Sequence, residues 1–498
     1  MNVNPITRLD YPDPDVIRVE DTYYMVSTTM HFMPGCEILQ SFDLVHWEHV
    51  TYVYETLDHT DAQQLKSGHN IYGQGMWAAS LRYHEGRFYI CFVANDTRKT
   101  YLYTSEKIDG PWKKQLIEGF YHDGSLLFDE DGRNYIVYGN DEIWITELNE
   151  DLTAPKKDGL HRLLVSDHKN PELGYEGSHI QKINGYYYIF LVHSLRDRWM
   201  RTEACFYSDS LEGEFTGGDV LCDDRGYCGQ GVAQGGIVDT PDGKWYAMLF
   251  QDSGAVGRIP ILLPVTWKDH FPIFGQNGHV PEEIEVHSTR PGYIYQPLVG
   301  SDDFCNGLLP RWQFNHDPDP RYYHLDALQG TYTITTREVC TELTQAVNTL
   351  TQRMSYPSCA AEVTVDASAL KEGDVAGLCA LQGCYAAVGI TKHHGKYEVL
   401  MLDKKEDGIL DMTEGTVVES HQMDFRLEAD FCNMKDEARC YYRVNKGDWL
   451  PIGTVHKLYF KLDHFTGCRF GLFCYAAEET GGSACFRDFK YYDVDEIS

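Results

Sequence analysis

Two carboxylates stand near the start of the chain, in the stretch YPDPD at residues 11–15. Asp and Pro are common in turns, so a turn would by itself account for Asp13 and Asp15. Crowded carboxylates can also divide the work of an acid and a base, because crowding raises the pKa of one and leaves another ionised. The choice between turn and chemistry depends on which other residues the fold brings to this segment.

A short tag that recurs five times in the first half of the chain indicates a repeat. Each copy has a turn residue, two variable residues and then a tyrosine inside an apolar run; the tyrosines are Tyr24, Tyr89, Tyr135, Tyr188 and Tyr246. Intervals of roughly 45 to 65 residues suit a four-stranded propeller blade with loop insertions. We therefore predict a five-bladed β-propeller, in which ring closure protects the strand edges.

The repeat also aligns one position near the start of the first strand of every blade. Counting eight or nine residues back from each turn residue reaches Asp13, Trp77, Asp123, Glu176 and Gln234. The first strand of a propeller blade lies innermost and opens on the central channel. The alignment therefore predicts that three carboxylates, one tryptophan and one glutamine converge there.

Such a ring suits the cleavage of a glycosidic bond. That reaction needs an acid to protonate the leaving oxygen and a carboxylate that acts on the opposite face of the sugar. A third carboxylate can raise the pKa of the acid, and Trp77 can pack against a sugar ring. The competing interpretations are a turn at Asp123, a surface acid at Glu176, or a cation site, although the sequence contains no DxDxDG-type calcium loop.

Composition limits the classes of function. The net charge of −32 disfavours nucleic acids and anionic membranes, which bind clustered Lys and Arg. No run reaches the ~18 apolar residues of a membrane span, and the first residues lack a signal-peptide pattern. The 15 cysteines include no CxxC pair and show no disulfide framework, so we expect a reducing cytoplasm.

The pattern changes after about residue 295. Segments such as YTITTREV and KYEVLML alternate with period two and are separated by Gly-rich turns, which favours a β-sandwich. A chain of 498 residues is also too long for one compact core. We predict a propeller over residues 1–295 and a sandwich over residues 296–498.

Four motifs in order resemble glycoside hydrolase family 43: YPDPDVI, HDGSLLFD, GYEGSHIQKINGYYY and GRIPILLPVTWKD. The resemblance covers nearly the whole chain and is nearest to the β-xylosidase and α-L-arabinofuranosidase members. It implies a jelly-roll-like, concanavalin-like accessory sandwich packed on the catalytic propeller. It also implies an exo-acting, inverting enzyme that releases terminal β-D-xylose, α-L-arabinofuranose or both from short xylo-oligosaccharides or arabinoxylan fragments.

The resemblance assigns roles residue by residue. Asp13 matches the general base, Glu176 the general acid, and Asp123 the carboxylate that tunes the acid and positions the sugar. The substrate-binding residues that it implies are Trp77, Arg258, Met30, His31, Phe32 and Gln234. Core packing is the alternative for Met30, His31 and Phe32, and ordinary strand pairing is the alternative for Arg258.

Gln234 departs from the family pattern. Many relatives have a histidine there, which in some lies near a central calcium. Gln234 still offers an oxygen, but a satisfied core amide is the interpretation that we favour. We therefore predict no metal ligand and no required cofactor, with calcium as the alternative.

Two other functions remain open: a strict α-L-arabinofuranosidase and a non-catalytic glycan-binding propeller. The presence of all three carboxylates weighs against the second. The expected partner is a small oligosaccharide, with no nucleic acid and no membrane, and a homo-oligomer is compatible with the sequence. The sandwich segment HFTGCRF, residues 464–470, is a candidate to help close the pocket mouth.

Overall fold

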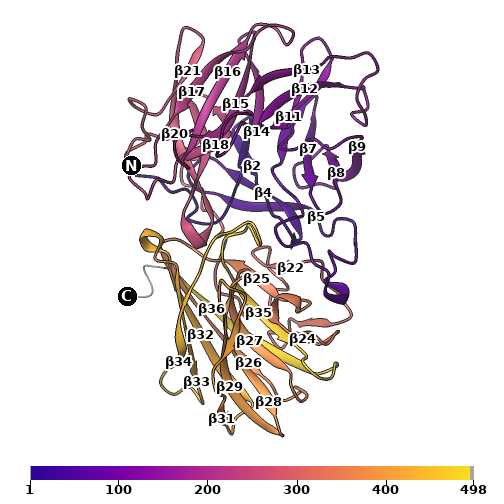
Figure 1. The fold of residues 1–498 in the computed structure, drawn as a ribbon, viewed down its shortest axis with the longest axis vertical. Coiled ribbons are helices and arrows are strands. Elements are labelled where there is room, and N and C mark those ends of the chain that lie inside the picture. Colours follow the sequence, from indigo (N-terminus) through magenta and orange to yellow (C-terminus); the bar gives the residue numbers. More distant parts are fainter. Residues whose placement is uncertain (1, 494–498) are drawn as a thin grey trace.

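The computed structural model describes residues 2–493 and shows a propeller above a sandwich (Figure 1). The propeller has five four-stranded sheets, each an antiparallel meander in chain order, which confirms the prediction from the repeat. Blade 1 contains β1 (Asp15–Val19), β2 (Thr22–Val26), β4 (Gly35–Ser41) and β5 (Glu48–Tyr54); blade 2 contains β6 (Ser80–His84), β7 (Arg87–Ala94), β8 (Lys99–Ser105) and β9 (Lys113–Ile117). Blade 3 contains β10 (Ser125–Phe128), β11 (Asn134–Asn140), β12 (Glu142–Leu148) and β13 (His161–Ser166). Blade 4 contains β14 (Glu176–Ile183), β15 (Tyr186–Ser194), β16 (Arg201–Ser208) and β17 (Thr216–Leu221); blade 5 contains β18 (Val232–Asp239), β19 (Trp245–Asp252), β20 (Arg258–Lys268) and β21 (Phe271–Phe274).

The five tag tyrosines lie on the second strand of their blades, β2, β7, β11, β15 and β19. Each second strand pairs with the first strand of its own blade, for example Tyr135 opposite Leu127 and Tyr188 opposite Gln181. Apolar side chains from neighbouring blades fill the space between the sheets. The tag therefore marks a constant register within the blade. For this reason, counting back from the tag finds equivalent positions near the first strand.

The ring closes where the N-terminal segment runs along β20. The Tyr11 N–H donates to the Arg258 carbonyl at 2.9 Å. The Asn4 side chain donates to the Leu262 carbonyl at 2.7 Å and accepts from the Leu262 N–H at 2.8 Å. These contacts join the first blade to the fifth and bring Asp13 beside Arg258.

The second body is a sandwich of two antiparallel sheets, as predicted. The larger sheet contains β3 (Phe32–Met33), β22 (Gln313–Asn315), β25 (Leu350–Arg353), β27 (Val375–Leu381), β28 (Ala386–His393), β29 (Lys396–Lys404), β30 (Leu410–Met412), β31 (Thr416–Val418) and β35 (Arg469–Tyr475). The smaller sheet contains β23 (Tyr323–Asp326), β24 (Thr331–Thr335), β26 (Ser358–Asp366), β32 (Gln422–Asp430), β33 (Glu437–Arg443), β34 (Leu450–Lys457) and β36 (Ser483–Asp493). Their inner faces share an apolar core that includes Trp312, Tyr332 and Phe425.

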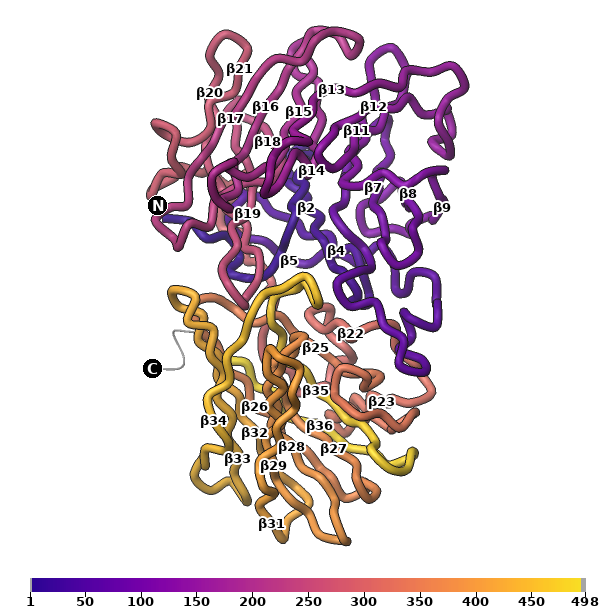
Figure 2. Tube along the Cα trace, in the orientation of Figure 1, coloured from indigo at the N-terminus to yellow at the C-terminus, as the bar shows by residue number. Residues whose placement is uncertain are grey.

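Helical structure in residues 2–493 is limited to four 3₁₀ turns: η1 (Lys66–Gly68), η2 (Gly254–Val256), η3 (Leu343–Gln345) and η4 (Cys432–Met434). Within this range, no helix has the length and apolar character needed to cross a membrane. Figure 2 shows a loop late in the chain (yellow) that reaches from the sandwich to the propeller.

One strand from the propeller segment belongs to a sandwich sheet. β3 lies between β2 and β4 and pairs with β22, with Met33 opposite Phe314. His31 and Phe32, which we predicted to bind substrate, are fully buried at this junction instead. The Arg469 guanidinium lies 3.5 Å from the centroid of the Phe32 ring. Phe32 pairs with Asn315 of β22, and the His31 ring contacts the rings of His316 and His464, so both side chains lie at the junction and neither lines the pocket.

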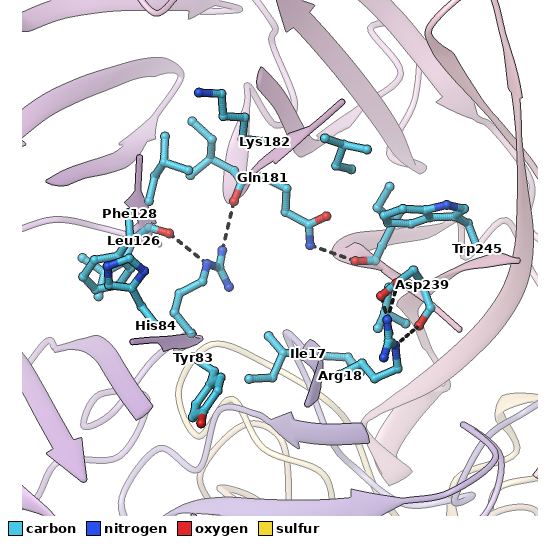
Figure 3. Close-up of a pocket in the computed structure, with 17 residues that line it drawn as sticks. Ile17, Arg18, Tyr83, His84, Leu126, Phe128, Gln181, Lys182, Asp239 and Trp245 are labelled. Carbon is cyan, nitrogen blue, oxygen red and sulfur yellow. Dashed lines mark hydrogen bonds and ion pairs between the residues drawn. The ribbon is translucent and has the colours of Figure 1, made fainter. Parts of the chain in front are cut away.

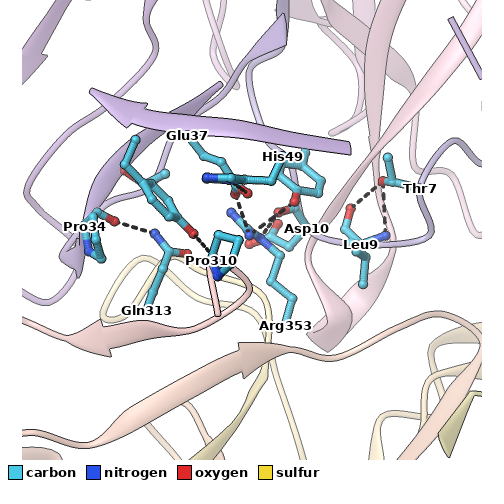
Figure 4. A network of polar contacts seen from close by, with 12 residues as sticks. Thr7, Leu9, Asp10, Pro34, Glu37, His49, Pro310, Gln313 and Arg353 are labelled. Atoms are coloured by element: carbon cyan, nitrogen blue, oxygen red, sulfur yellow. Dashed lines mark hydrogen bonds and ion pairs between the residues drawn. The ribbon is translucent and has the colours of Figure 1, made fainter. Parts of the chain in front are cut away.

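Arg353 carries a positive charge from the sandwich into the propeller (Figure 4). Its guanidinium donates to the Glu37 carboxylate at 2.8 Å and to the Asp10 carbonyl at 2.9 Å. It also lies 4.1 Å from the centroid of the Tyr11 ring. Burial alone would raise the pKa of Glu37, but the Arg353 charge and the hydrogen bond with His49 lower it to about 2. The junction thus contains a buried ion pair between Arg353 of the sandwich and Glu37 of the propeller.

Replacing Arg353 with methionine should lower the free energy of unfolding by about 3–5 kcal/mol, because Glu37 would remain buried with His49 as its partner and without the arginine charge. The double variant Arg353→Met, Glu37→Gln should recover much of this loss, since it removes both charges. Urea unfolding at pH 7 measures both effects. A single-variant loss below about 1 kcal/mol, the range of an exposed pair, would contradict the assignment.

Candidate active site

The five aligned positions meet in one small pocket of about 40 Å³ at the end of the channel that faces the sandwich. Its lining residues are Pro12, Asp13, Thr28, Met30, Trp77, His122, Asp123, Glu176, Gln234, Arg258 and Phe465. The structure therefore brings together every residue that the repeat aligned, along with Met30 and Arg258. Four residues of the lining were not among the predicted site residues: Pro12, Thr28, His122 and Phe465.

The backbone is unusual at the aligned positions. Asp13, Asp123 and Gln234 have left-handed φ angles of 54°, 48° and 64°. Such a conformation costs a non-glycine residue about 1–3 kcal/mol and persists only where the surroundings impose it. In blade 4, Gly177 takes the left-handed conformation instead, at φ 66°, beside a register shift between Glu176 and His179. Four of the five blades thus have a left-handed residue at or next to the aligned position.

Asp13 is held from two sides. The Thr28 hydroxyl donates to Asp13 Oδ2 at 2.5 Å, and Arg258 Nη1 donates to Asp13 Oδ1 at 3.2 Å. Arg258 is fixed in turn by Asp10, whose Oδ1 accepts from the Arg258 N–H at 2.7 Å. The Oδ2 of Asp10 accepts from the N–H of Gly467 in the sandwich at 2.8 Å. The predicted base is therefore oriented through a chain of contacts that reaches the second body.

Asp123 and Glu176 lie on either side of His122. The His122 Nε2 atom is 3.6 Å from Asp123 Oδ2 and 3.6 Å from Glu176 Oε2. Asp123 also accepts from the Gly177 N–H at 2.9 Å, and Asn140 donates to Glu176 Oε2 at 2.8 Å. Sequence reasoning missed His122, although it directly precedes Asp123 in YHDGS, where a titratable side chain beside an aligned acid was a usable signal.

Crowding separates the pKa values of these groups. Burial raises the pKa of Asp123 to about 6. Burial also acts to raise the pKa of Glu176, but the nearby His122 imidazolium and the charges of Arg201 and Arg258 outweigh it, and the pKa is lowered. Burial would lower the pKa of His122, yet the charges of Asp123 and Glu176 raise it to about 9. The raised carboxyl pKa therefore belongs to Asp123 rather than to the predicted acid Glu176, because the imidazolium charge and the two arginines favour ionised Glu176.

A loop of the sandwich completes the pocket. The Phe465 ring, from the candidate segment HFTGCRF, lies 5.4 Å from the Trp77 ring, centroid to centroid. The Arg258 guanidinium lies 4.3 Å from the centroid of the Phe465 ring. The indole Nε1 of Trp77 is buried and has no hydrogen-bond partner among residues 2–493. The pocket thus combines aromatic walls with an unused donor, which suits a ligand rich in hydroxyl groups.

A larger cavity of about 650 Å³ adjoins the pocket and shares Trp77, Glu176, Arg258 and Phe465 with it. Its outer lining includes Trp199 and Arg201 from the propeller segment and Met434, Phe460, Lys461 and Leu462 from the sandwich. Arg201 pairs with Asp252, and burial followed by the charge of Arg258 lowers the pKa of Arg201 to about 9. Arg201 follows no repeat tag, so the sequence offered no register by which to find it.

A hollow of about 410 Å³ lies at the opposite end of the channel (Figure 3). Its polar groups are satisfied within the propeller: Arg18 pairs with Asp239, and Gln181 Nε2 donates to the Ile237 carbonyl at 2.8 Å. Arg82 donates to Asp15 at 2.8 Å, so the second acid of YPDPD has a structural partner. We assign no chemistry to this hollow.

In the part of the chain that the structure describes, one group of three has ligand atoms close enough for a metal ion: His122, Asp123 and Glu176, within 4.8 Å of one another. These are also the groups whose pKa values are shifted for proton exchange, and His122 already supplies positive charge there. We do not assign them as metal ligands, and the absence of a required cofactor stays a prediction.

A propeller with three carboxylates in an aromatic-walled axial pocket defines a protein that cleaves glycosides. Residues 3–272 match the model of glycosyl hydrolases family 43, and residues 301–492 match the concanavalin A-like C-terminal domain of β-xylosidases. The chain belongs to glycosyl hydrolases family 43 and is a glycoside hydrolase.

Known proteins resemble the chain over both bodies. A β-xylosidase of Formosa agariphila is 27% identical, over 99% of this chain and 89% of that protein. A Bacteroides eggerthii structure described as bifunctional GH43-CE is 42% identical with a TM-score of 0.92; the match covers 98% of this chain and 63% of that longer chain. A GH43 enzyme engineered to show endo-xylanase and exo-arabinofuranosidase activity is 27% identical with a TM-score of 0.86, over 99% of each chain.

The variant Asp123→Asn should be more stable than the native protein at pH 8 but not at pH 4. The pKa of about 6 in the folded state lies above the ordinary value of 3.8, so folding opposes ionisation. The free energy of unfolding of the native protein therefore falls as the pH rises from about 4 to 6. A difference of two pKa units corresponds to about 3 kcal/mol of stability, which the native protein loses at high pH. The Asp123→Asn variant does not ionise at this position and therefore keeps that stability.

Asparagine retains an acceptor for the Gly177 N–H and tolerates the left-handed backbone. Urea unfolding of both proteins at pH 4 and pH 8 measures the difference in stability. The assignment requires this difference to grow between the two pH values. An equal difference at both would show that Asp123 has an ordinary pKa.

Proposed function

We propose that the protein is an exo-acting hydrolase that releases terminal β-D-xylose, α-L-arabinofuranose or both from short xylo-oligosaccharides or arabinoxylan fragments. The observation that carries this proposal is the convergence of Asp13, Asp123 and Glu176 in one small pocket closed by Phe465. A pocket of this kind suits the end of a glycan chain better than its middle. The relatives described above include a β-xylosidase and an enzyme with exo-arabinofuranosidase activity, which supports both sugars.

The proposed reaction inverts the anomeric carbon in one displacement. Asp13 takes a proton from a water molecule, which attacks the anomeric carbon while Glu176 protonates the departing oxygen. Asp123 contacts the Gly177 N–H beside Glu176 and can position both the acid and the sugar. The buried Nε of Arg258 and Nε1 of Trp77 make no hydrogen bond in the described chain, although Arg258 Nε lies 3.4 Å from Asp252 Oδ1. These donors are available to the sugar hydroxyl groups.

The larger cavity supplies a place for the leaving group. It reaches Glu176, the proposed acid, and continues outward past Trp199, whose side chain is 45% exposed. Its volume exceeds that of the inner pocket by more than tenfold, as about 650 Å³ compared with about 40 Å³. This asymmetry supports removal of one terminal sugar from a substrate whose remainder lies outside.

We further propose a cytoplasmic location and short imported oligosaccharides as substrates. All 15 cysteines are free, and a reducing compartment keeps thiols in that state. No cofactor takes part in the proposed reaction. A homo-oligomer stays compatible with this function.

The variants Glu176→Gln and Asp13→Asn should each lose a factor of about 10²–10⁴ in the hydrolysis of xylobiose or an arabinofuranosyl xylo-oligosaccharide, because each removes one proton-transfer group. Release of nitrophenol from the xyloside and the arabinofuranoside identifies the accepted sugar. The variant Glu212→Gln, which changes an exposed acid outside the pocket, serves as the control.

NMR of the sugar first formed tests the stereochemistry. An inverting enzyme gives α-xylose from a β-xyloside. A β-configured first product would contradict inversion, and a native protein that binds but hydrolyses neither sugar would identify a glycan-binding propeller.

A further inference from the structure

His122 has an unused polar atom between two carboxylates of the pocket. Its Nε2 is buried, has no hydrogen-bond partner within residues 2–493, and lies 3.6 Å from both Asp123 Oδ2 and Glu176 Oε2. The imidazole packs beside Trp77 with ring centroids 6.0 Å apart. The ring is thus held at the acid side of the pocket, with one nitrogen directed between the two carboxylates.

Other charged groups face this pair from the surrounding elements. Arg201 and Arg258 lie on the side of Glu176, and each forms an ion pair with Asp252. Asp13 contributes negative charge from the start of blade 1. Glu203, on the same strand as Arg201, accepts from the Gln234 N–H at 2.7 Å, and burial raises its pKa well above the ordinary value. Glu172 and Lys461 complete the charged lining of the adjoining cavity.

This arrangement leaves the proton on the wrong group for chemistry. The pKa of His122 is raised to about 9 and that of Glu176 is lowered, so at neutral pH the imidazole holds the proton that the leaving oxygen needs. A glycosidic oxygen leaves poorly without that proton. A separation of 3.6 Å can shorten when substrate fills the pocket, as catalytic hydrogen bonds often do.

We propose that His122 is the proton reservoir of the general acid and passes its Nε2 proton to Glu176 as Glu176 protonates the leaving oxygen. The proposal rests on the proposed function of the same pocket. His122 acts only through Glu176 and does not touch the scissile bond.

The protons balance over one turnover. Asp13 gains one proton from the attacking water, Glu176 gives one to the leaving oxygen, and His122 replaces the proton on Glu176. After the products leave, Asp13 releases its proton to solvent and His122 takes one up. The net reaction consumes one water and no proton.

A purely electrostatic role for His122 predicts the opposite pH dependence. If the imidazolium only stabilised ionised Glu176, removing it would raise the pKa of Glu176 and extend activity to higher pH. If His122 supplies the proton, activity persists until the imidazole itself loses its proton near pH 9. Without His122, activity should then end at the lower pH at which Glu176 by itself loses its proton.

The variants His122→Phe, which keeps a ring beside Trp77, and His122→Asn, which keeps a polar group, separate these roles. We expect the alkaline limb of kcat for the disaccharide substrate to move down by about 1 pH unit or more in both variants. At pH 8 the loss of kcat should be larger for the disaccharide than for the nitrophenyl glycoside of the same sugar, because nitrophenolate leaves without a proton. The variant His161→Phe, at an exposed position of β13, is the matched control and should keep the native profile.

The outcomes distinguish this proposal from the proposed function. If the alkaline limb stays in place or moves up in both variants, while the native protein cleaves both substrates, the proton-reservoir role of His122 is wrong. The proposed hydrolase function is then unaffected. If the native protein cleaves neither substrate, the proposed hydrolase function itself is wrong. NMR titration of the native His122 imidazole gives an independent reading that needs no folded variant. A neutral imidazole at pH 7 would overturn the proposal.

Discussion

Three carboxylates confined in one poorly solvated pocket are the constraint on which the rest of the structure depends. Each must be compensated, and the compensating groups come from different parts of the ring: Thr28 and Arg258 for Asp13, and the Gly177 N–H for Asp123. Thr28 lies in the same blade as Asp13, but Arg258 comes from blade 5, and Gly177 of blade 4 donates to Asp123 of blade 3. The five sheets must therefore close in register before the pocket has its electrostatic character, which ties the chemistry to the completeness of the ring.

The sandwich belongs to this site as well as to the stability of the chain. Asp10 accepts hydrogen bonds from the backbone of Arg258 and from Gly467, so a single carboxylate links the pocket to the loop that carries Phe465. β3 extends a sandwich sheet with residues from the propeller segment. The two bodies are thus joined by paired charges and shared strands, which position an aromatic wall over the pocket.

The cost of the site is visible in its backbone and its pKa values. Left-handed conformations at Asp13, Asp123 and Gln234 and a buried carboxyl whose pKa is raised to about 6 all oppose folding. Active sites commonly retain such destabilising features because function requires them. The raised carboxyl pKa belongs to Asp123 rather than to Glu176, because the imidazolium of His122 and two arginines favour ionised Glu176.

The sequence by itself determined the five-bladed ring, the sandwich and the convergence of Asp13, Trp77, Asp123, Glu176 and Gln234, because a repeated blade keeps a constant register that can be counted along the chain. Only the tertiary structure decided which residues from outside that register join them. His122 lies directly before an aligned acid, where its position was a usable signal, whereas Arg201 lies on the third strand of its blade, where no spacing marked it. Phe465 reaches the pocket from the second body, and pairing of β3 with β22 removes His31 and Phe32 from it. Contacts between segments some 300 residues apart depend on how the two bodies pack, and local periodicity carries no information about that packing.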